Sequence, residues 1–314
     1  AMSILNRSGS TAPELFSAFQ NRSYRFQFGS DLLNSWAFEM ETLILGWFVL
    51  VTTDSPLLLA AFAALNFSGT LLSPFFGVLA DRVDRRTLLI ILRGIYATLA
   101  GVILVLAVLG SVEPWQVFLI SAFSGLVRPS DFAVKFALIA DSVPRKDLRN
   151  AIGFSRATMD SARIFGALLG AGLFSTLGIG AAYGAVVGLY LVSILLAFRI
   201  TTRRSRPAES TRPWTELVSG FAYIRRNQTL LAIMALAFLA NFTGFPIIRG
   251  LLPALARDIY GMNENGLAWL IALLAVGALL GSLLTATLIR VRTPGRMMVF
   301  WILIWHALII ISGQ

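Results

Sequence analysis

The 314-residue chain contains no cysteine and only one histidine, His306. The missing cysteines exclude disulfides, thiolate nucleophiles and cysteine-ligated metals, and one histidine cannot form a histidine metal cluster. Charged residues are also scarce, at 13% against about 25% in an average soluble domain. Hydrophobic residues instead make up 57% of the chain. This composition predicts a membrane protein.

Sequence motifs of common enzymes are missing as well. The chain has no Gly-x-Ser-x-Gly, phosphate-binding loop, dinucleotide fingerprint or metal-ligand set. We therefore expect no enzymatic activity and no cofactor or metal. The first residues, 1–23, are polar and lack an apolar core followed by a cleavage site, so we expect no removable signal peptide.

Long apolar segments dominate what is present. Because roughly 20 apolar residues span a bilayer, the sequence predicts an all-α polytopic protein with nine transmembrane helices. Their expected bounds are 26–52, 57–79, 87–110, 115–140, 150–176, 180–200, 229–254, 266–289 and 296–312.

One long hydrophilic stretch, 201–228, divides these helices into six and three. Its later part, 214–226, places apolar residues on one face at helical spacing, which favours an amphipathic helix on the membrane surface. We therefore expect four parts: an N-terminal segment 1–25, a six-helix bundle 26–200, the linker 201–228 and a partial second bundle 229–314.

The net charge of +10 could suggest nucleic-acid binding, but membrane loops also collect cations on their cytoplasmic side. With the N-terminus inside, the cations do fall on one side of the predicted helices, and the opposite loops hold only Arg257. This asymmetry predicts a cytoplasmic N-terminus and no nucleic-acid partner. Besides the linker, the cytoplasmic cations are Arg7, Arg22, Arg25, Arg82, Arg85, Arg86, Arg145, Lys146, Arg149, Arg290, Arg292 and Arg296.

A charged decapeptide, Gly77-Val-Leu-Ala-Asp81-Arg82-Val-Asp84-Arg85-Arg86, separates the second and third helices. Small residues there allow close helix approach, Asp81 can cap a helix end or pair with a cation, and the arginines suit a headgroup surface. The segment resembles the loop between helices 2 and 3 of major facilitator superfamily transporters, Gly-x-Leu-Ala-Asp-Arg-x-Gly-Arg-Arg. Only Asp84 departs from that pattern. The resemblance implies a gating motif of Gly77, Asp81, Arg82, Arg85 and Arg86.

Other segments resemble the exporter branch of this family, which includes bacterial siderophore, macrolide and multidrug carriers. They are Arg25, the run Gly46 to Pro56, and the run Leu252 to Arg257. The resemblance implies two six-helix halves and proton-driven antiport across the bacterial inner membrane. The run Gly166 to Gly172 keeps the glycines of an antiporter element but lacks its proline, so close helix packing is an equal interpretation. The loop Arg290 to Arg296 occupies the place where the gating motif repeats.

Ionisable side chains inside the apolar segments are the candidates for function, because a charge at the bilayer centre costs about 3 kcal/mol. Segment 26–52 contains Asp31, Glu39 and Glu41. Glu39 and Glu41 point about 200° apart on one helix, and we expect Glu41 to face the cavity and Glu39 to face another helix. Such a carboxylate could carry protons, bind a cationic substrate or pair with a buried arginine.

Segment 115–140 carries Arg128, Asp131 and Lys135 at i, i+3 and i+7, so they share one face. The family resemblance implies a role for Arg128 in proton coupling. Segment 150–176 carries Asp160 and Arg163 at the same kind of spacing, with Asp160 roughly 15 Å deep. We expect these groups to form a network bridging the first, fourth and fifth helices, either as a proton relay or as a static scaffold.

In segment 229–254, Asn241, Pro246 and Arg249 occur in a run that also contains two glycines. Proline and glycine should break the helix and free backbone carbonyls where the helix meets substrate. Arg249 could attract a carboxylate or catecholate of the substrate, or pair with a carboxylate of the first helix. Aromatic residues could line the cavity or equally contact lipid, namely Trp36, Phe38, Phe67, Phe242 and Trp269.

Two functions are compatible with the sequence. The first is a monomeric secondary transporter that exports an amphipathic small organic molecule, drug-like or siderophore-like, in exchange for protons by alternating access. The second is a truncated, non-transporting relative that acts as a membrane scaffold or sensor. We include this alternative because the family plan continues for three helices beyond the ninth predicted helix.

Overall fold

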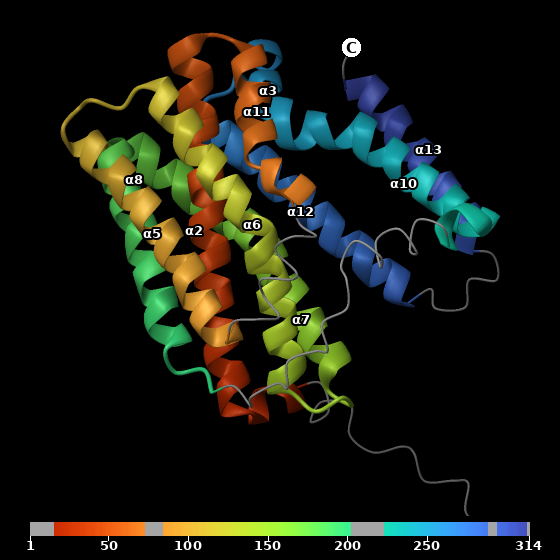
Figure 1. Cartoon of the computed structure of the whole chain (residues 1–314). Helices are drawn as coiled ribbons and strands as arrows, with labels where there is room; N and C mark the ends of the chain where they lie inside the picture. The colour runs from red at the N-terminus through yellow and green to blue at the C-terminus, as the bar shows by residue number, and fades with distance from the viewer. Residues whose placement is uncertain (1–15, 73–83, 202–222, 288–293, 313–314) are drawn as a thin grey trace, which may run out of the picture.

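The computed structural model describes residues 16–72, 84–201, 223–287 and 294–312. Within these ranges the chain is helical and contains no strand (Figure 1). A short 3₁₀ turn, η1 (Ser17–Gln20), leads into the first long helix. The predicted surface helix 214–226 falls largely on undescribed residues, and only its last four residues are described, as helix.

The first long apolar helix is α2 (Arg22–Thr53). Asn21 caps its start, and Asp54 follows its last residue. Asn21 accepts a hydrogen bond from the Ser23 amide (2.9 Å), and Asp54 ends the helix in the left-handed conformation with φ 49°. The next helix, α3 (Pro56–Leu65), starts with proline in its first turn, where a missing N–H is harmless. A 3₁₀ segment, η2 (Ser68–Leu72), continues it.

Helices α5 (Arg85–Val108) and α6 (Pro114–Ser142) form the next antiparallel pair. Asp84 is the N-cap of α5, since its carboxylate accepts hydrogen bonds from the Thr87 amide (2.9 Å) and hydroxyl (3.0 Å). This capping role explains why aspartate suits the one position that departs from the family pattern. Helix α6 starts with a reciprocal cap between Glu113 and Gln116 and continues through Pro129.

The next three elements follow one another directly in the chain: α7 (Leu148–Ser161), the π-helical turn η3 (Ala162–Gly166) and α8 (Ala167–Ala197). Gly178 breaks α8 with φ 79° and ψ 176°. A straight helix over Asn150–Ala197, 48 residues, would be about 72 Å long, more than twice the thickness of a bilayer core. The Gly178 break divides this segment close to the predicted boundary between 176 and 180.

The later part of the chain contains α10 (Gln228–Pro246), the π-helical turn η4 (Ile247–Leu251), α11 (Leu252–Ala254), the π-helical turn η5 (Leu255–Ile259), α12 (Glu264–Thr287) and α13 (Pro294–Ser312). The predicted break at Pro246 is confirmed, because regular α-helix stops there and a π-helical turn follows. Helices α10 and α13 lie beside each other, away from the bundle built on α2 (Figure 1).

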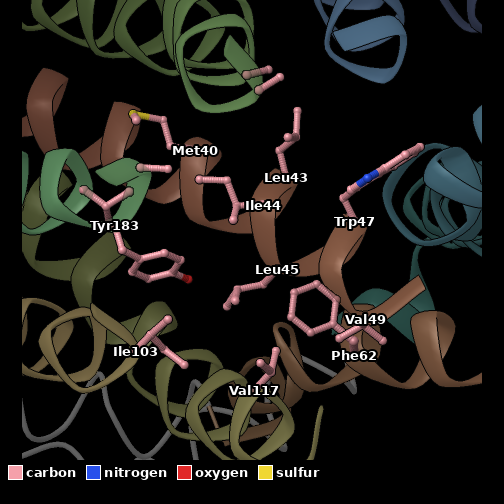
Figure 2. Packing of buried hydrophobic residues seen from close by; sticks show 14 of the residues in the cluster. Met40, Leu43, Ile44, Leu45, Trp47, Val49, Phe62, Ile103, Val117 and Tyr183 are labelled. Carbon is pink, nitrogen blue, oxygen red and sulfur yellow. The ribbon is translucent and has the colours of Figure 1, made fainter. Parts of the chain in front are cut away.

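Helix α2 lies at the centre of the bundle and packs most extensively against α8. Figure 2 shows the apolar core around it, where Ile44 and Leu45 of α2 lie near Tyr183 of α8, Ile103 of α5 and Val117 of α6. Small residues set the spacing, since a Cβ on Gly170 would lie 3.0 Å from the Met40 Cα. The close α2–α8 contact fixes the rotation of α2 and hence which of its side chains face the cavity.

Five described helical segments are long and apolar enough to cross a membrane: Arg22–Thr53, Arg85–Val108, Pro114–Ser142, Asn150–Ala197 and Glu264–Gly281. Shorter apolar helices occupy Pro56–Thr70, Gln228–Gly244 and Val299–Leu308. The protein is thus an all-helical membrane protein. The count of nine crossings and the cytoplasmic N-terminus stay predictions.

Gly125 of α6 and Gly69 of η2 form a backbone-to-backbone crossing. A Cβ on Gly125 would clash with the Leu65 carbonyl oxygen, and one on Gly69 would clash with the Gly125 carbonyl oxygen. We expect Gly125→Ala to lower the free energy of unfolding by roughly 1–3 kcal/mol, because a rigid backbone cannot move aside. Thermal unfolding in detergent, followed by tryptophan fluorescence, measures this loss.

Gly101→Ala in α5 is the matched control, because nothing lies within 4 Å of its added Cβ. Alanine there should stabilise the helix by up to about 1 kcal/mol. If Gly125→Ala unfolds at the same temperature as Gly101→Ala or above it, the crossing is not as tight as described.

Candidate functional site

A cavity of about 420 Å³ lies between α2, α6 and the junction of α7 with η3, with α5 and η2 at its sides. Four cationic and three carboxylate side chains line it, together with a cluster of phenylalanines. Charges inside a membrane bundle are costly unless they serve binding or pairing, which makes this cavity the candidate site. The charged lining residues are Asp31, Glu39, Arg93, Arg128, Asp131, Lys135 and Arg163.

The most deeply buried charges of the cavity are Asp31 and Arg93, whose side chains are 3% and 1% exposed. They form an ion pair, and the Arg93 guanidinium also donates hydrogen bonds to the hydroxyls of Ser30 and Ser193, the latter at 3.0 Å. Ser193 in turn donates to the Ser30 carbonyl at 2.8 Å. This cluster joins α2, α5 and α8 at one wall of the cavity.

A second ionic group lies at the π-helical turn. The Arg163 guanidinium lies 3.5 Å from the Asp160 carboxylate and 4.0 Å from the Glu39 carboxylate. The turn approaches α2 closely because Gly166 has no side chain, and a Cβ there would lie 2.9 Å from the Trp36 carbonyl oxygen. The expected link between the first and fifth helices is therefore present in the structure.

The charged face of α6 is also directed into the cavity as its spacing predicts, since Arg128, Asp131 and Lys135 all line it. The Arg128 guanidinium stacks over the Phe38 ring, 3.5 Å from its centroid, with the Phe67 ring 5.3 Å away. One carboxylate oxygen of Asp131 is buried without a hydrogen-bond partner in the described part of the chain. Arg93, Lys135 and Arg128 all act on that carboxylate electrostatically.

The expected orientation of the two glutamates of α2 is wrong. Glu39 lines the cavity, whereas Glu41 is buried behind it against α8, where the Tyr190 hydroxyl donates a 3.0 Å hydrogen bond to its carboxylate. The buried Tyr183 hydroxyl also interacts electrostatically with the Glu41 carboxylate. Glycines on α8 and η3 set this rotation through their contacts with Trp36 and Met40. Helical spacing separates the two glutamates but cannot say which one faces the cavity.

Glu41 borders a second pocket of about 10 Å³, space for a single water, lined by hydroxyl and amide side chains including Thr42 and Asn66. Phe38 lines both this pocket and the main cavity. The Phe38 ring, under the Arg128 guanidinium, therefore separates Glu41 from the cavity.

Several predicted residues lie elsewhere. Asn241 is exposed on α10 and donates a 2.8 Å hydrogen bond to the Ala237 carbonyl of its own helix, so it does not line the cavity. The side chain of Arg249 and the motif residues Gly77, Asp81 and Arg82 lie outside the described residues.

The last two residues of the gating motif are described and tie the start of α5 to neighbouring helices. Arg85 forms a 2.7 Å ion pair with Asp141 near the end of α6. Arg86 donates a 2.5 Å hydrogen bond to the Phe198 carbonyl after α8. Both contacts hold helix ends of the first bundle together, on the side where the motif is expected.

Arg93, Tyr183 and Tyr190 were not among the residues predicted from the sequence. Arg93 could have been found, because it is the only charge between Thr87 and Gly110. The tyrosines carry no such signal, since their importance depends on their contact with Glu41 across the α2–α8 interface.

A polytopic helical bundle with a charged, aromatic-lined cavity inside its apolar helices is typical of membrane transport proteins. The sequence profile of the Major Facilitator Superfamily matches residues 30–313. The chain belongs to this family, and its members are transporters rather than enzymes.

Two curated proteins that are similar to this chain are named as a transporter and an exporter. The chain is 25% identical over 264 residues to the uncharacterized MFS-type transporter YfiS of Bacillus subtilis, covering 81% of this chain and 60% of YfiS. It is 23% identical over 222 residues to the enterobactin exporter EntS of Escherichia coli, covering 71% of this chain and 53% of EntS. The chain thus spans between half and two thirds of these relatives' length.

Two solved structures share the fold at low sequence identity. A bacterial homolog of the human lysosomal transporter Spinster, inward-facing and unoccupied, aligns with a TM-score of 0.61 at 16% identity, over 89% of this chain and 64% of that one. An auto-inhibited POT family peptide transporter aligns with a TM-score of 0.52 at 17% identity, over 82% of this chain and 52% of that one.

Proposed function

We propose that the protein is a secondary transporter that exports an amphipathic small organic molecule in exchange for protons by alternating access. The observation that carries the proposal is the cavity between α2 and α6, with its four cations, three carboxylates and phenylalanines. Its volume of about 420 Å³ falls in the range of small-molecule sites, roughly 300–1,000 Å³. Rocking of two helical halves about such a midplane site moves solute across the membrane.

The proposed solute is drug-like or siderophore-like. Phenylalanine rings offer stacking surfaces, and Arg128 and Lys135 offer cations to an acidic or phenolic group. The similarity to an exporter of enterobactin supports a siderophore-like solute and an outward direction. Arg249 stays a proposed contact for an anionic group of that solute.

Protons are the proposed coupling ion because carboxylates are concentrated in and beside the cavity. Asp31, Glu39 and Asp131 line it, Asp160 pairs with Arg163 at its edge, and Glu41 lies behind it. A carboxylate that gains and loses a proton changes its attraction for the neighbouring guanidinium groups, which would link protonation to helix movement.

We further propose the arrangement in the membrane. The N-terminus faces the cytoplasm of a bacterial cell, nine helices cross the inner membrane, and residues 26–200 and 229–314 form a complete and a partial bundle joined by 201–228. The protein acts as a monomer whose partners are solute, protons and lipid. The one-sided distribution of loop cations supports this orientation.

Everted membrane vesicles test this function. Vesicles energised by respiration hold a proton gradient, and adding a transported solute should release protons and dissipate it. Catecholates, macrolides and lipophilic cations are the three solute classes to compare. We expect one class to cause dissipation in vesicles carrying the protein but not in vesicles lacking it.

Collapse of the gradient by an uncoupler is the control. It should reduce uptake of the active solute to background. Uptake that persists unchanged would contradict proton antiport. Absence of uptake for all three classes would favour the non-transporting alternative.

A further inference from the structure

Arg257 connects two parts of the chain far apart in sequence. It lies on η5, and its guanidinium donates to the Asp54 carboxylate at 2.7 Å and to the Leu50 carbonyl at 3.0 Å. Its third nitrogen donates to the carboxylate of neighbouring Asp258 at 2.5 Å. The hydrogen bond to Asp258 is the largest of several interactions that raise the pKa of Arg257 above its usual value, so the side chain stays cationic.

The contact surface on α2 is the end of the helix. Asp54 caps α2 in the left-handed conformation, and its amide bonds to the same Leu50 carbonyl that Arg257 reaches. Helix C-termini carry carbonyls without helical partners and a partial negative charge. A guanidinium at this position is therefore attracted both by the Leu50 carbonyl and by the Asp54 carboxylate.

Two further hydrogen bonds at this edge also join the N-terminal bundle to the later part of the chain. Ser175 and Asn265 exchange hydrogen bonds of 3.1 and 3.4 Å between α8 and α12. Ser175 lies just before the Gly178 break, and the far end of α8 reaches the start of α2 through the Thr201 amide, which donates to the Ser23 hydroxyl at 3.0 Å. The Gly178 break therefore lies at the edge where α2 ends.

This edge is well separated from the candidate site. Glu39, the cavity residue nearest to the end of α2, precedes Asp54 by 15 residues, about 22 Å along a helix. The contact of Arg257 with α2 therefore bears on access to the cavity from this edge and not on the binding of solute.

We propose that Arg257, Asp54 and the Leu50 carbonyl form a clasp that holds this edge of the protein closed and opens once in each transport cycle. The inference depends on the proposed alternating access. A clasp suits this task because the Asp54 side chain is 84% exposed, and exposed ion pairs are weak enough to break reversibly. The Asp31–Arg93 pair, almost fully buried, is suited to stay intact.

The clasp also accounts for the two sequence runs that resemble the exporter branch, Gly46 to Pro56 and Leu252 to Arg257. The structure brings these runs together, since the first supplies Leu50 and Asp54 and the second supplies Arg257. Neither run contributes a residue to the lining of the cavity.

The missing cysteines make the test direct. Leu57 and Tyr260, exposed by 78% and 46%, lie three residues beyond Asp54 and Arg257 and can be changed to cysteine and labelled with nitroxides. Pulsed electron–electron distance measurement in lipid nanodiscs then compares this pair alone with the pair plus Arg257→Gln or Asp54→Asn. Asparagine tolerates the left-handed conformation, so Asp54→Asn removes the charge and keeps the turn.

We expect Arg257→Gln, which removes both contacts, to raise the ratio of long to short distances roughly tenfold, and Asp54→Asn, which keeps the contact with the Leu50 carbonyl, to raise it roughly threefold. Arg199→Gln, which removes an exposed guanidinium at the opposite edge, is the matched control and should leave the distances unchanged. If Arg257→Gln fails to fold, Asp54→Asn alone decides. Distances identical to the parent pair in the clasp substitutions would overturn the proposal.

The measurement needs no solute, so its result can be compared with the result of the vesicle assay. Opening of the edge without any solute-dependent flux in vesicles would support the clasp and contradict transport. Flux in vesicles with unchanged distances would support transport and contradict the clasp.

Discussion

Replacing Arg93 by leucine is expected to lower the free energy of unfolding by about 3–5 kcal/mol, because the change leaves the buried Asp31 carboxylate without its partner. Arg93 and Asp31 are 1% and 3% exposed, and the guanidinium also satisfies the hydroxyls of Ser30 and Ser193. Chemical or thermal unfolding in detergent, followed by tryptophan fluorescence, measures the loss.

The double substitution Asp31→Leu with Arg93→Leu is the matched control. A buried ion pair replaced by apolar side chains of similar volume often costs little, because both desolvation penalties disappear. We therefore expect the double variant to unfold much closer to the parent protein than Arg93→Leu does. Equal losses in the single and double variants would mean that Arg93 stabilises the bundle by packing rather than by pairing.

Glu41→Gln is expected to reduce proton-driven flux to background in the vesicle assay and to leave the protein folded. Glutamine has the shape of glutamate, and its carbonyl can still accept the Tyr190 hydrogen bond, now 3.0 Å. It cannot take up or release a proton. The pocket beside Glu41, with Thr42 and Asn66 in its wall, has space for one water next to this carboxylate.

Glu39→Gln separates the roles of the two glutamates. Glu39 lines the cavity and lies 4.0 Å from Arg163, so its loss should weaken solute binding and raise the KM of uptake while proton-driven flux continues. Unfolding curves show whether either variant is damaged. Normal proton-driven flux in a folded Glu41→Gln protein would assign Glu41 a structural role as partner of the tyrosines on α8.

The helices themselves follow closely from local sequence. The predicted segment 115–140 corresponds to α6, Pro114–Ser142, because apolar length and a proline at the start are local properties. The gap expected between 176 and 180 coincides with Gly178, where only glycine readily takes a φ of 79°. The charged face of Arg128, Asp131 and Lys135 was predictable for the same reason, since helical spacing fixes it.

Partners between helices were not predictable in this way. The expected charge network contained Asp31 but not Arg93, because nothing in the local sequence of either helix indicates which neighbour each one faces. The network also links the first helix to the predicted third helix through Arg93 and to the predicted sixth helix through Ser193, whereas only the first, fourth and fifth helices were expected.

The sequence by itself determined the class of the protein, the positions of its helices and the set of charges available for function. These follow from composition, from the length of apolar runs and from helical spacing, all of which act over a few neighbouring residues. The tertiary structure decided that Glu39 rather than Glu41 faces the cavity and that Arg257 reaches the end of α2. Both depend on the rotation and approach of helices distant in sequence, which close contacts such as those of Gly166 and Gly170 with α2 fix only in the folded bundle.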